Sequence, residues 1–365
     1  GTSPQIVTAG QNGSPVTAVP DTGYHFMQWS DGSPANPRQD LAVYANITVA
    51  ASFALDEFTL TYTAGANGHI EGDSPQTVTY GSDGSAVTAV PDAGAYFVQW
   101  SDGNPNASRQ DTSIMSDLTV EAVFGVIINS IEELQLIGAA PAYPLDGYYR
   151  MDADINAAGA KGYAPVGSAD TPFTGHFDGN GFAITGFHLD GWDRPNNGVF
   201  SVIGAGGSVS NLTLTDVNVP ASGTNTGALC GQNNGLIKNC HVTGSVYADW
   251  YAPHRGGLVG TNTETGVVED SSSAAEVCGR GGSVGGLLGI NYGTLTRCHA
   301  TGNVHGRECV GGLIGYCLFG TLTQCYATGN VDNVQEYGPL GGLCGVLSTS
   351  TVRECFATGN VTSPL

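Results

Sequence analysis

Arginine and aromatic side chains recur in a series of loops along the C-terminal two thirds of the chain. Tryptophan, tyrosine and arginine are the residue types enriched at interaction hot spots. The loops carry Trp192, Arg194, Trp250, Tyr251, His254, Arg255, Arg280 and Arg307. We expect these residues to form a ligand- or partner-binding edge. The alternative is that the loops simply vary from one another, as surface loops do.

Catalytic motifs give no comparable signal. The sequence has neither an HExxH zinc motif nor a P-loop. The segment GGSVG at 281–285 matches the nucleophile elbow G-x-S-x-G, but it lacks the strand-to-helix context of that motif. Asp178, in FDGNG at 177–181, could serve a glycosidase or polyuronate lyase, yet the turn composition accounts for it. We therefore predict no catalytic residue and no enzyme activity.

The cysteines do not suggest a metal site. All 9 lie between Cys230 and Cys355, and no two of them form a CxxC pair. They follow the repeat described below, where stacked parallel side chains rarely reach disulfide torsions, so free, buried thiols are expected. No metal or cofactor is predicted. Ca²⁺ bridging by exposed aspartates is left open without a specific motif.

The charge balance excludes some partners. The chain has 32 acidic residues against 11 Lys and Arg, which gives a formal net charge of -21. This acidity disfavours a nucleic-acid partner. No apolar run approaches the length of a membrane span, so membrane insertion is not expected. The sequence starts at Gly1 without a signal-like segment, and we expect a processed chain or a fragment of a secreted protein.

The first third of the chain consists of two copies of one module. Residues 3–53 align without a gap onto residues 74–124, sharing VTAVPD and WSDG. Stretches of alternating polarity at 58–62, 77–80 and 118–124 predict strands. We expect Trp29 and Trp100 to anchor the two cores, because so short a module needs a large side chain at its centre.

These modules resemble the bacterial surface repeats typified by internalin B-repeats. The pattern G-Y-x-F-x-x-W-S-D-G of that family is present at Gly23–Gly32. The resemblance predicts two small β domains, at residues 1–54 and 55–125. The segment 58–70 has no counterpart in the first copy, so that module should lack its opening strand. An upstream segment or another chain would then have to pair with the open edge.

The rest of the chain, residues 126–365, carries a second repeat. The recurring tetrapeptides GLVG, GLLG, GLIG and GLCG begin at residues 257, 286, 312 and 342. Three columns stay apolar or small through five copies: Ile237, Val268, Leu295, Leu322, Val352; Cys240, Ser271, Cys298, Cys325, Cys355; and Val246, Val277, Val304, Val331, Val361. Such columns predict the stacked coils of a parallel β-helix.

The spacing within one repeat predicts a corner, and a separate motif before the first repeat predicts a capping helix. Leu295 and Cys298 are three residues apart, so a flat strand would place them on opposite faces, and a bend should fall at Thr296 and Arg297. Ser130 and Glu133 match a capping box that opens a short helix through Ile137, expected to cap the solenoid.

The repeats with C-x-x-T-G-x-V resemble GLUG motifs, as at Cys298–Val304. That family occurs in bacterial adhesins and in N-terminal regions of immunoglobulin A peptidases. The fold expected is therefore all-β: two tandem modules and a parallel β-helix with a short N-terminal capping helix. The function expected is that of a secreted, extracellular or cell-surface structural and adhesive protein, with self-assembly into fibres as a possibility. The alternative is a carbohydrate-binding or polysaccharide-cleaving β-helix.

Two kinds of partner are expected. One is a host or matrix glycan or protein. A short polar loop at 221–226 between two aromatic loops would leave a notch roughly two coil spacings wide, suited to a sugar or a protruding chain. The other is a second copy of this chain, bound head to tail, because both ends expose open edges and the acidic modules complement the arginine edge.

Overall fold

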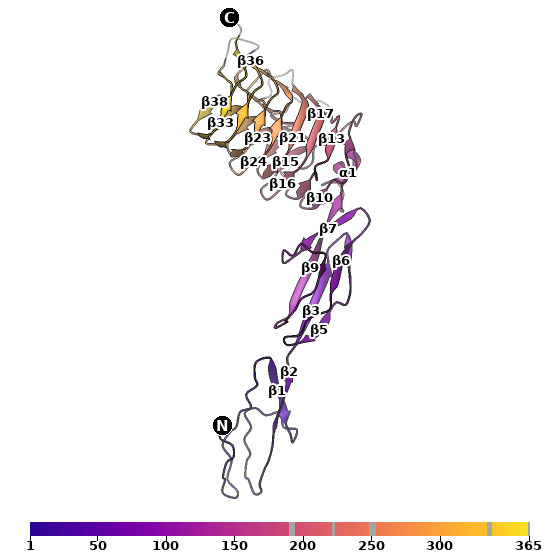
Figure 1. Ribbon diagram of the computed structural model, residues 1–365, viewed down its shortest axis with the longest axis vertical. Helices are drawn as coiled ribbons and strands as arrows, with labels where there is room; N and C mark the ends of the chain where they lie inside the picture. The colour runs from indigo at the N-terminus through magenta and orange to yellow at the C-terminus, as the bar shows by residue number, and fades with distance from the viewer. Residues whose placement is uncertain (190–193, 221–222, 248–252, 334–337, 364–365) are drawn as a thin grey trace. The chain divides into compact units, whose positions relative to one another are not determined.

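A computed structural model describes residues 1–189, 194–220, 223–247, 253–333 and 338–363. The chain divides into two compact units, Gly1–Phe124 and Gly125–Leu365. The described residues form an all-β structure with one α-helix, as the sequence predicts (Figure 1). None of the helical structure described here is long and apolar enough to cross a membrane.

The second module is a complete small β domain. Its central strand β3 pairs antiparallel with β5 and parallel with β9, while β4, β6 and β8 form a second sheet. The strands are β3 (Glu57–Ala64), β4 (Gly68–Glu71), β5 (Gln76–Thr79), β6 (Val87–Pro91), β7 (Ala95–Trp100), β8 (Ser108–Arg109) and β9 (Leu118–Ile127). Trp100 is fully buried among Leu60, Tyr62 and Phe97, which confirms its place in the core.

The first module keeps only part of this architecture. Its strands β1 (Tyr24–Trp29) and β2 (Ala51–Leu55) pair antiparallel, and isolated bridges join Gln11 to Val43 and Val16 to Arg38. Trp29 is buried, as expected. No strand equivalent to β3 or β4 is present in residues 1–54.

The second unit is a stack of coils built from four parallel sheets, in which each strand pairs with its equivalent in the next coil (Figure 1). The first sheet contains β10 (Tyr148–Arg150), β12 (His176–Asp178), β16 (Ser208–Ser210), β20 (Leu236–Lys238), β24 (Val267–Glu269), β29 (Thr294–Thr296), β34 (Thr321–Thr323) and β39 (Thr351–Arg353). The second begins with β11 (Ile155–Asn156), β13 (Ala183–Thr185), β17 (Thr213–Pro220) and β21 (His241–Tyr247).

After β21 the second sheet divides into two rows of shorter strands. One row holds β25 (Ser272–Ser273), β30 (His299–Ala300), β35 (Tyr326–Ala327) and β40 (Phe356–Ala357). The other holds β26 (Glu276–Cys278), β31 (Val304–Gly306), β36 (Val331–Asn333) and β41 (Val361–Thr362). The third sheet contains β14 (Asn196–Asn197), β18 (Asn225–Thr226), β22 (His254–Gly256), β27 (Ser283–Gly285), β32 (Cys309–Gly311) and β37 (Leu340–Gly341). The fourth contains β15 (Phe200–Ile203), β19 (Cys230–Asn233), β23 (Val259–Asn262), β28 (Leu288–Asn291), β33 (Ile314–Leu318) and β38 (Cys344–Ser348).

The corner between the first and second sheets forms where the sequence predicts it. Arg297 follows β29 directly and has a φ of 52°, in the left-handed region, which turns the chain between Leu295 and Cys298. The equivalent residues of other coils share this conformation: Asn211, Asn239, Asp270, Gln324 and Glu354. Asn and Asp adopt it at low cost, whereas Arg, Gln and Glu require support from the coils above and below.

The solenoid core runs continuously from coil to coil. The predicted inward residues Leu322, Cys298 and Val304 are fully buried, and their columns are buried through the preceding coils. In the last coil the expectation does not hold, because no described coil covers it: Val352 and Cys355 are half-buried and Val361 is 45% exposed. Asparagines add a buried polar ladder, in which Asn233 Nδ2 donates to Asn262 Oδ1 and Asn262 Nδ2 donates to Asn291 Oδ1, both at 2.8 Å. Such a ladder satisfies polar groups that would be costly to bury alone.

The helix α1 (Ile131–Leu136) begins at the predicted cap. Ser130 Oγ accepts from the Glu133 amide, and Glu133 Oε2 accepts from the Asn129 amide. Ile131 and Leu134 are buried in the solenoid core. All nine cysteines are free, but only five are buried as expected, and Cys278, Cys309, Cys344 and Cys355 are half-buried.

Candidate functional site

The predicted arginine and aromatic edge lies beside the third sheet. Trp192, Trp250 and Tyr251 lie outside the described residues, as do parts of the loops expected to form the notch. Arg194 is half-buried just before β14, and Arg307 is half-buried between β31 and β32. Arg280 is exposed between β26 and β27. Arg280 and Arg307 therefore lie in equivalent loops of successive coils.

Arg255 does not lie on the exposed edge, so that expectation was wrong. It is the middle residue of β22 and is fully buried, since the alternation of the strand turns its side chain into the coil. Gly279 leaves the space that it needs, because a Cβ there would lie 2.8 Å from Arg255 Nη1. Burial lowers the pKa of the Arg255 guanidinium to about 10. Arg255 thus belongs to the interior, and the exposed edge loses one of its four predicted arginines.

His254 precedes Arg255 and is half-buried in β22. Burial lowers the pKa of its imidazole, and the charge of neighbouring Arg255 adds to this effect against an opposing backbone hydrogen bond at Pro253. A histidine in this environment stays neutral at physiological pH. It can therefore take part in hydrogen bonding but adds no positive charge to the edge.

The two motifs that formally suggested catalysis have structural roles. Asp178 Oδ1 accepts from the Asn180 amide and from Asn211 Nδ2, both at 2.9 Å, so it holds the corner between β12 and β13. Ser283 is buried within β27, in a parallel sheet and not at a strand-to-helix turn.

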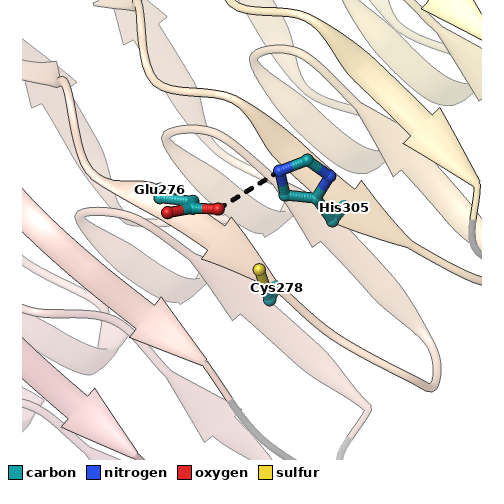
Figure 2. A group of neighbouring side chains, drawn as sticks. All are labelled: Glu276, Cys278 and His305. Carbon is teal, nitrogen blue, oxygen red and sulfur yellow. Dashed lines mark ion pairs between the residues drawn. The ribbon is translucent and has the colours of Figure 1, made fainter.

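A different group of reactive side chains comes together on the outer face of the second sheet (Figure 2). Glu276 and Cys278 lie on β26, on either side of the buried Val277, and both face outward. The register of the sheet pairs Cys278 with His305 of β31. One ligand atom from each of Glu276, Cys278 and His305 lies within 4.8 Å of the others.

His305 is held by carboxylates on both sides. Its Nε2 lies 3.3 Å from Glu276 Oε1, and its Nδ1 lies 2.8 Å from Asp332 Oδ1. Asp332 belongs to β36 and is the register partner of His305 in the next coil. Three stacked strands therefore present a cysteine, a histidine and an aspartate in a row, with Glu276 beside them.

The thiol of Cys278 is protonated in this setting. Burial raises its pKa to about 11, and the negative charges of Glu276 and Asp332 contribute to the increase. Among the described residues, this is the one group of three or more His, Cys, Asp and Glu side chains close enough to share a metal ion. The arrangement can bind a cation, whereas its protonated thiol is a poor nucleophile.

Sequence reasoning missed this cluster although its signal was present. Cys278, His305 and Asp332 each follow a valine of one inward column: Val277, Val304 and Val331. Because consecutive residues of a strand face opposite sides, the residue after each inward valine must face outward. Aligning the coils one residue beyond the valines would have placed the three side chains together.

Comparison with known families supports both repeat assignments. Residues 1–57 and 58–128 match the divergent InlB B-repeat domain, and residues 280–304 and 306–332 match the GLUG motif. The chain is therefore a repeat protein that carries both elements.

Two relatives extend this comparison. Halomucin of Haloquadratum walsbyi is 29% identical over 298 residues, which are 71% of this chain and 3% of Halomucin. A protein of Evansella cellulosilytica, provisionally described as a Gly-rich membrane protein, is 39% identical over 105 residues. Those residues are 27% of this chain and 12% of that protein, so the chain spans a small part of both relatives.

A solved structure shares the fold. It is provisionally described as an immunoglobulin A1 protease from Bacteroides ovatus and aligns with a TM-score of 0.59 at 23% identity. The alignment covers 66% of this chain and 77% of that structure. Identity this low shows a common β-helical fold alone.

Proposed function

We propose that this chain is part of an extracellular cell-surface protein with a structural and adhesive role. The B-repeat modules act as spacers, and the solenoid acts as a rigid rod whose loops meet a partner. Similarity to Halomucin and to a protein described as a membrane protein supports surface association. The strongly acidic composition also suits a soluble, solvent-exposed structure.

One observation carries this proposal: the unbroken core of the solenoid. Each coil buries its apolar residues against neighbouring coils, as Leu295 stacks on Leu322 in register. Such a stack is stiff along its axis, and its core does not depend on the sequence of the loops. Loops such as those of Arg280 and Arg307 can therefore vary between coils while the rod that presents them stays the same.

Surface location can be tested on cells that produce the protein. Antibodies raised against the chain should label intact cells, and mild external proteolysis should release fragments that contain the repeats. Labelling that requires cell lysis would contradict the proposal.

Adhesion can be tested with the purified chain on arrays of glycans and matrix proteins. We expect saturable binding that is weakened at least about tenfold in an Arg280→Glu/Arg307→Glu double variant, since rim charges steer encounter with a partner. A Lys238→Glu/Arg353→Glu double variant is the matched control, because it makes the same charge change at two exposed side chains of the first sheet. Equal loss in both variants would show a general charge effect and not a specific edge.

Head-to-tail association of copies is a further part of the proposal. The acidic B-repeat modules, with 13 Asp and Glu and two Arg in residues 1–125, have the opposite charge to the Arg280 and Arg307 loops of the solenoid. Light scattering over a range of protein and salt concentrations should show association that weakens in the Arg280→Glu/Arg307→Glu variant. A monomer under every condition would rule it out.

We also propose that the chain has no catalytic activity of its own. Asp178 and Ser283 have structural positions, which supports this proposal. The test is incubation of the pure chain with immunoglobulin A1 and with polyuronates and other glycans. Specific cleavage of the immunoglobulin, or release of unsaturated or reducing sugars, would overturn the proposal and favour the enzymatic alternative.

A further inference from the structure

The cluster on the outer face of the second sheet has the composition of a transition-metal site. Cys278 supplies a thiol, His305 an imidazole and Glu276 a carboxylate, the ligand types that Zn²⁺ prefers in proteins. A surface ion pair would need only His305 and a carboxylate. The thiol, placed beside the imidazole by the strand register, gives a softer donor set than an exposed acidic cluster provides.

Asp332 orients His305 in the way that metal-binding histidines are oriented. The Nδ1–H group can donate to Asp332 Oδ1 at 2.8 Å, which leaves Nε2 directed toward Glu276 and Cys278. A carboxylate on the far nitrogen fixes the tautomer and raises the basicity of the ligating nitrogen. Asp332 is thus a positioning residue and not a ligand.

We propose that Glu276, Cys278 and His305 form a binding site for Zn²⁺ or a similar borderline divalent cation, with Asp332 as the positioning residue. The ligand atoms are Glu276 Oε1, Cys278 Sγ and His305 Nε2. Three protein ligands leave the fourth tetrahedral position for water or for a donor from a partner. The site deepens the proposed surface function, because such an open position could link this solenoid to a second molecule.

The observed spacing is close to what coordination requires. Tetrahedral Zn²⁺ with bonds of about 2.0–2.3 Å places its ligand atoms roughly 3.3–3.7 Å apart. The three donors lie within 4.8 Å of one another, and Glu276 has a side chain that is 60% exposed and can therefore adjust. The buried Val277 and Val304 fix the strands that carry these residues, so only side chains need to move for the three donors to reach coordination distances.

Binding of the cation releases one proton from the Cys278 thiol. The S–H bond breaks, the sulfur bonds to the metal and the proton passes to buffer, without any change in oxidation state. Burial, followed by the charges of Glu276 and Asp332, raises the Cys278 pKa in the metal-free protein, and the positive charge of a bound divalent cation opposes this effect.

The test is titration of the full chain with Co²⁺ and with Zn²⁺. Co²⁺ should bind one per chain and show visible d–d bands with a thiolate-to-cobalt charge-transfer band, both removed by one equivalent of Zn²⁺. A large excess of Ca²⁺ should not displace it, since Ca²⁺ prefers all-oxygen sites. Calorimetry in buffers of different ionisation enthalpy should detect the released proton.

Variants separate this site from the other cysteines. Cys278→Ser should abolish the charge-transfer band and weaken binding by more than about 100-fold, whereas Cys309→Ser, at a half-buried thiol on the third sheet, should change neither. Glu276→Gln changes an exposed side chain that folding does not require, so weakened binding there cannot be attributed to unfolding. Asp332→Asn should weaken binding about 10–100-fold but keep the charge-transfer band, because the thiolate remains.

Two results would overturn the proposal. One is absence of stoichiometric binding to the reduced, folded wild-type chain. The other is a charge-transfer band that survives Cys278→Ser or disappears with Cys309→Ser. Neither result bears on surface location or adhesion of the apo chain, which the experiments of the previous subsection test separately.

Discussion

The two N-terminal modules have closely similar sequences but differ in how much of the β domain each forms. The second module has seven strands, whereas the first has two strands and isolated bridges. Positions that match in sequence differ in burial: Val120 is 3% exposed, while its equivalent Val49 is only half-buried, and Val87 and Val16 differ in the same way. The repeat sequence alone therefore does not determine how far the sheet forms.

The first module has no counterpart of β3, and this difference explains which of its strands do not form. In the second module β3 pairs with residues 76–79 on one side and 118–122 on the other. The equivalent residues of the first module are 5–8 and 47–51, and all of them except Ala51, the first residue of β2, lie outside strands. They border a groove of about 520 Å³ that includes Gln5, Trp29 and Val49. The groove lies where β3 would lie.

The side-chain anchors persist without that strand. Arg38 pairs with Asp31 and Asp40 and stacks on Trp29, just as Arg109 pairs with Asp102 and Asp111 and stacks on Trp100. Each tryptophan also donates from Nε1 to a backbone carbonyl six residues on. Local anchors are thus encoded within the module, while strand pairing depends on a segment before it.

The largest difference in stability loss between the two modules should appear when each tryptophan is replaced in turn. Trp100→Ala should destabilise the second module by about 3–5 kcal/mol, because Trp100 is fully buried. Trp29→Ala should cost clearly less, since one side of Trp29 lines the open groove. Hydrogen exchange followed by mass spectrometry on peptides from each module measures both effects in the full chain. Equal losses would mean that the two cores are equivalent in solution.

A peptide with the sequence of the absent strand should make the first module more stable and bring it closer to the second. The sequence of residues 56–72, added to the full chain, should pair in the groove and slow exchange at residues 5–8 and 47–49. At a hundredfold excess over its dissociation constant the stabilisation would be about 2.7 kcal/mol. A peptide with Asp at the positions of Leu60 and Tyr62 is the control, since both side chains face the core. Protection by the control peptide, or none by either, would contradict the assignment of the groove.

The same contrast separates what sequence predicts from what it does not. Residues with a strong local or periodic signal were placed correctly: the Ser130 cap, the bend at Arg297 and the inward columns. Arg255 was placed wrongly, because composition favours arginine at a surface and only the strand register shows that it points inward. The metal-ligand cluster was missed for a related reason, since it exists only across coils.

Removing one hydroxyl should produce a smaller loss in the second module. Tyr62 Oη donates to Asp111 Oδ2 at 2.7 Å, and burial followed by Asp111 raises the Tyr62 pKa, so the hydroxyl keeps its proton. Tyr62→Phe should cost about 1.5–3 kcal/mol, the usual range for a hydrogen bond to a charged group. Tyr44→Phe is the control, at a side chain that is exposed in the first module. A neutral Tyr62→Phe would show that β3 is held by backbone pairing and packing alone.

The smallest expected difference between the two modules is in how much stability each loses at low pH. Burial alone would raise the Asp111 pKa, but hydrogen bonds from Arg109 and Tyr62 outweigh it and the pKa is lowered. The Asp102 pKa is lowered chiefly by its hydrogen bond from Arg109. A carboxylate with a lowered folded-state pKa contributes stability above its unfolded value of 3.8, and that contribution is lost as the pH falls through the folded pKa.

The second module should therefore lose more stability below about pH 4 than the first, because its ion pairs are less solvated. In the first module Asp31 also has a lowered pKa, owing to its hydrogen bond from Arg38, but this aspartate is largely exposed and solvent screens the pair. Hydrogen exchange at pH 5 and pH 3, corrected for intrinsic rates, measures the difference. Asp111→Asn should lower the stability of the second module at pH 5 and reduce its further loss at pH 3. An unchanged acid response in that variant would place the acid sensitivity outside the Arg109 network.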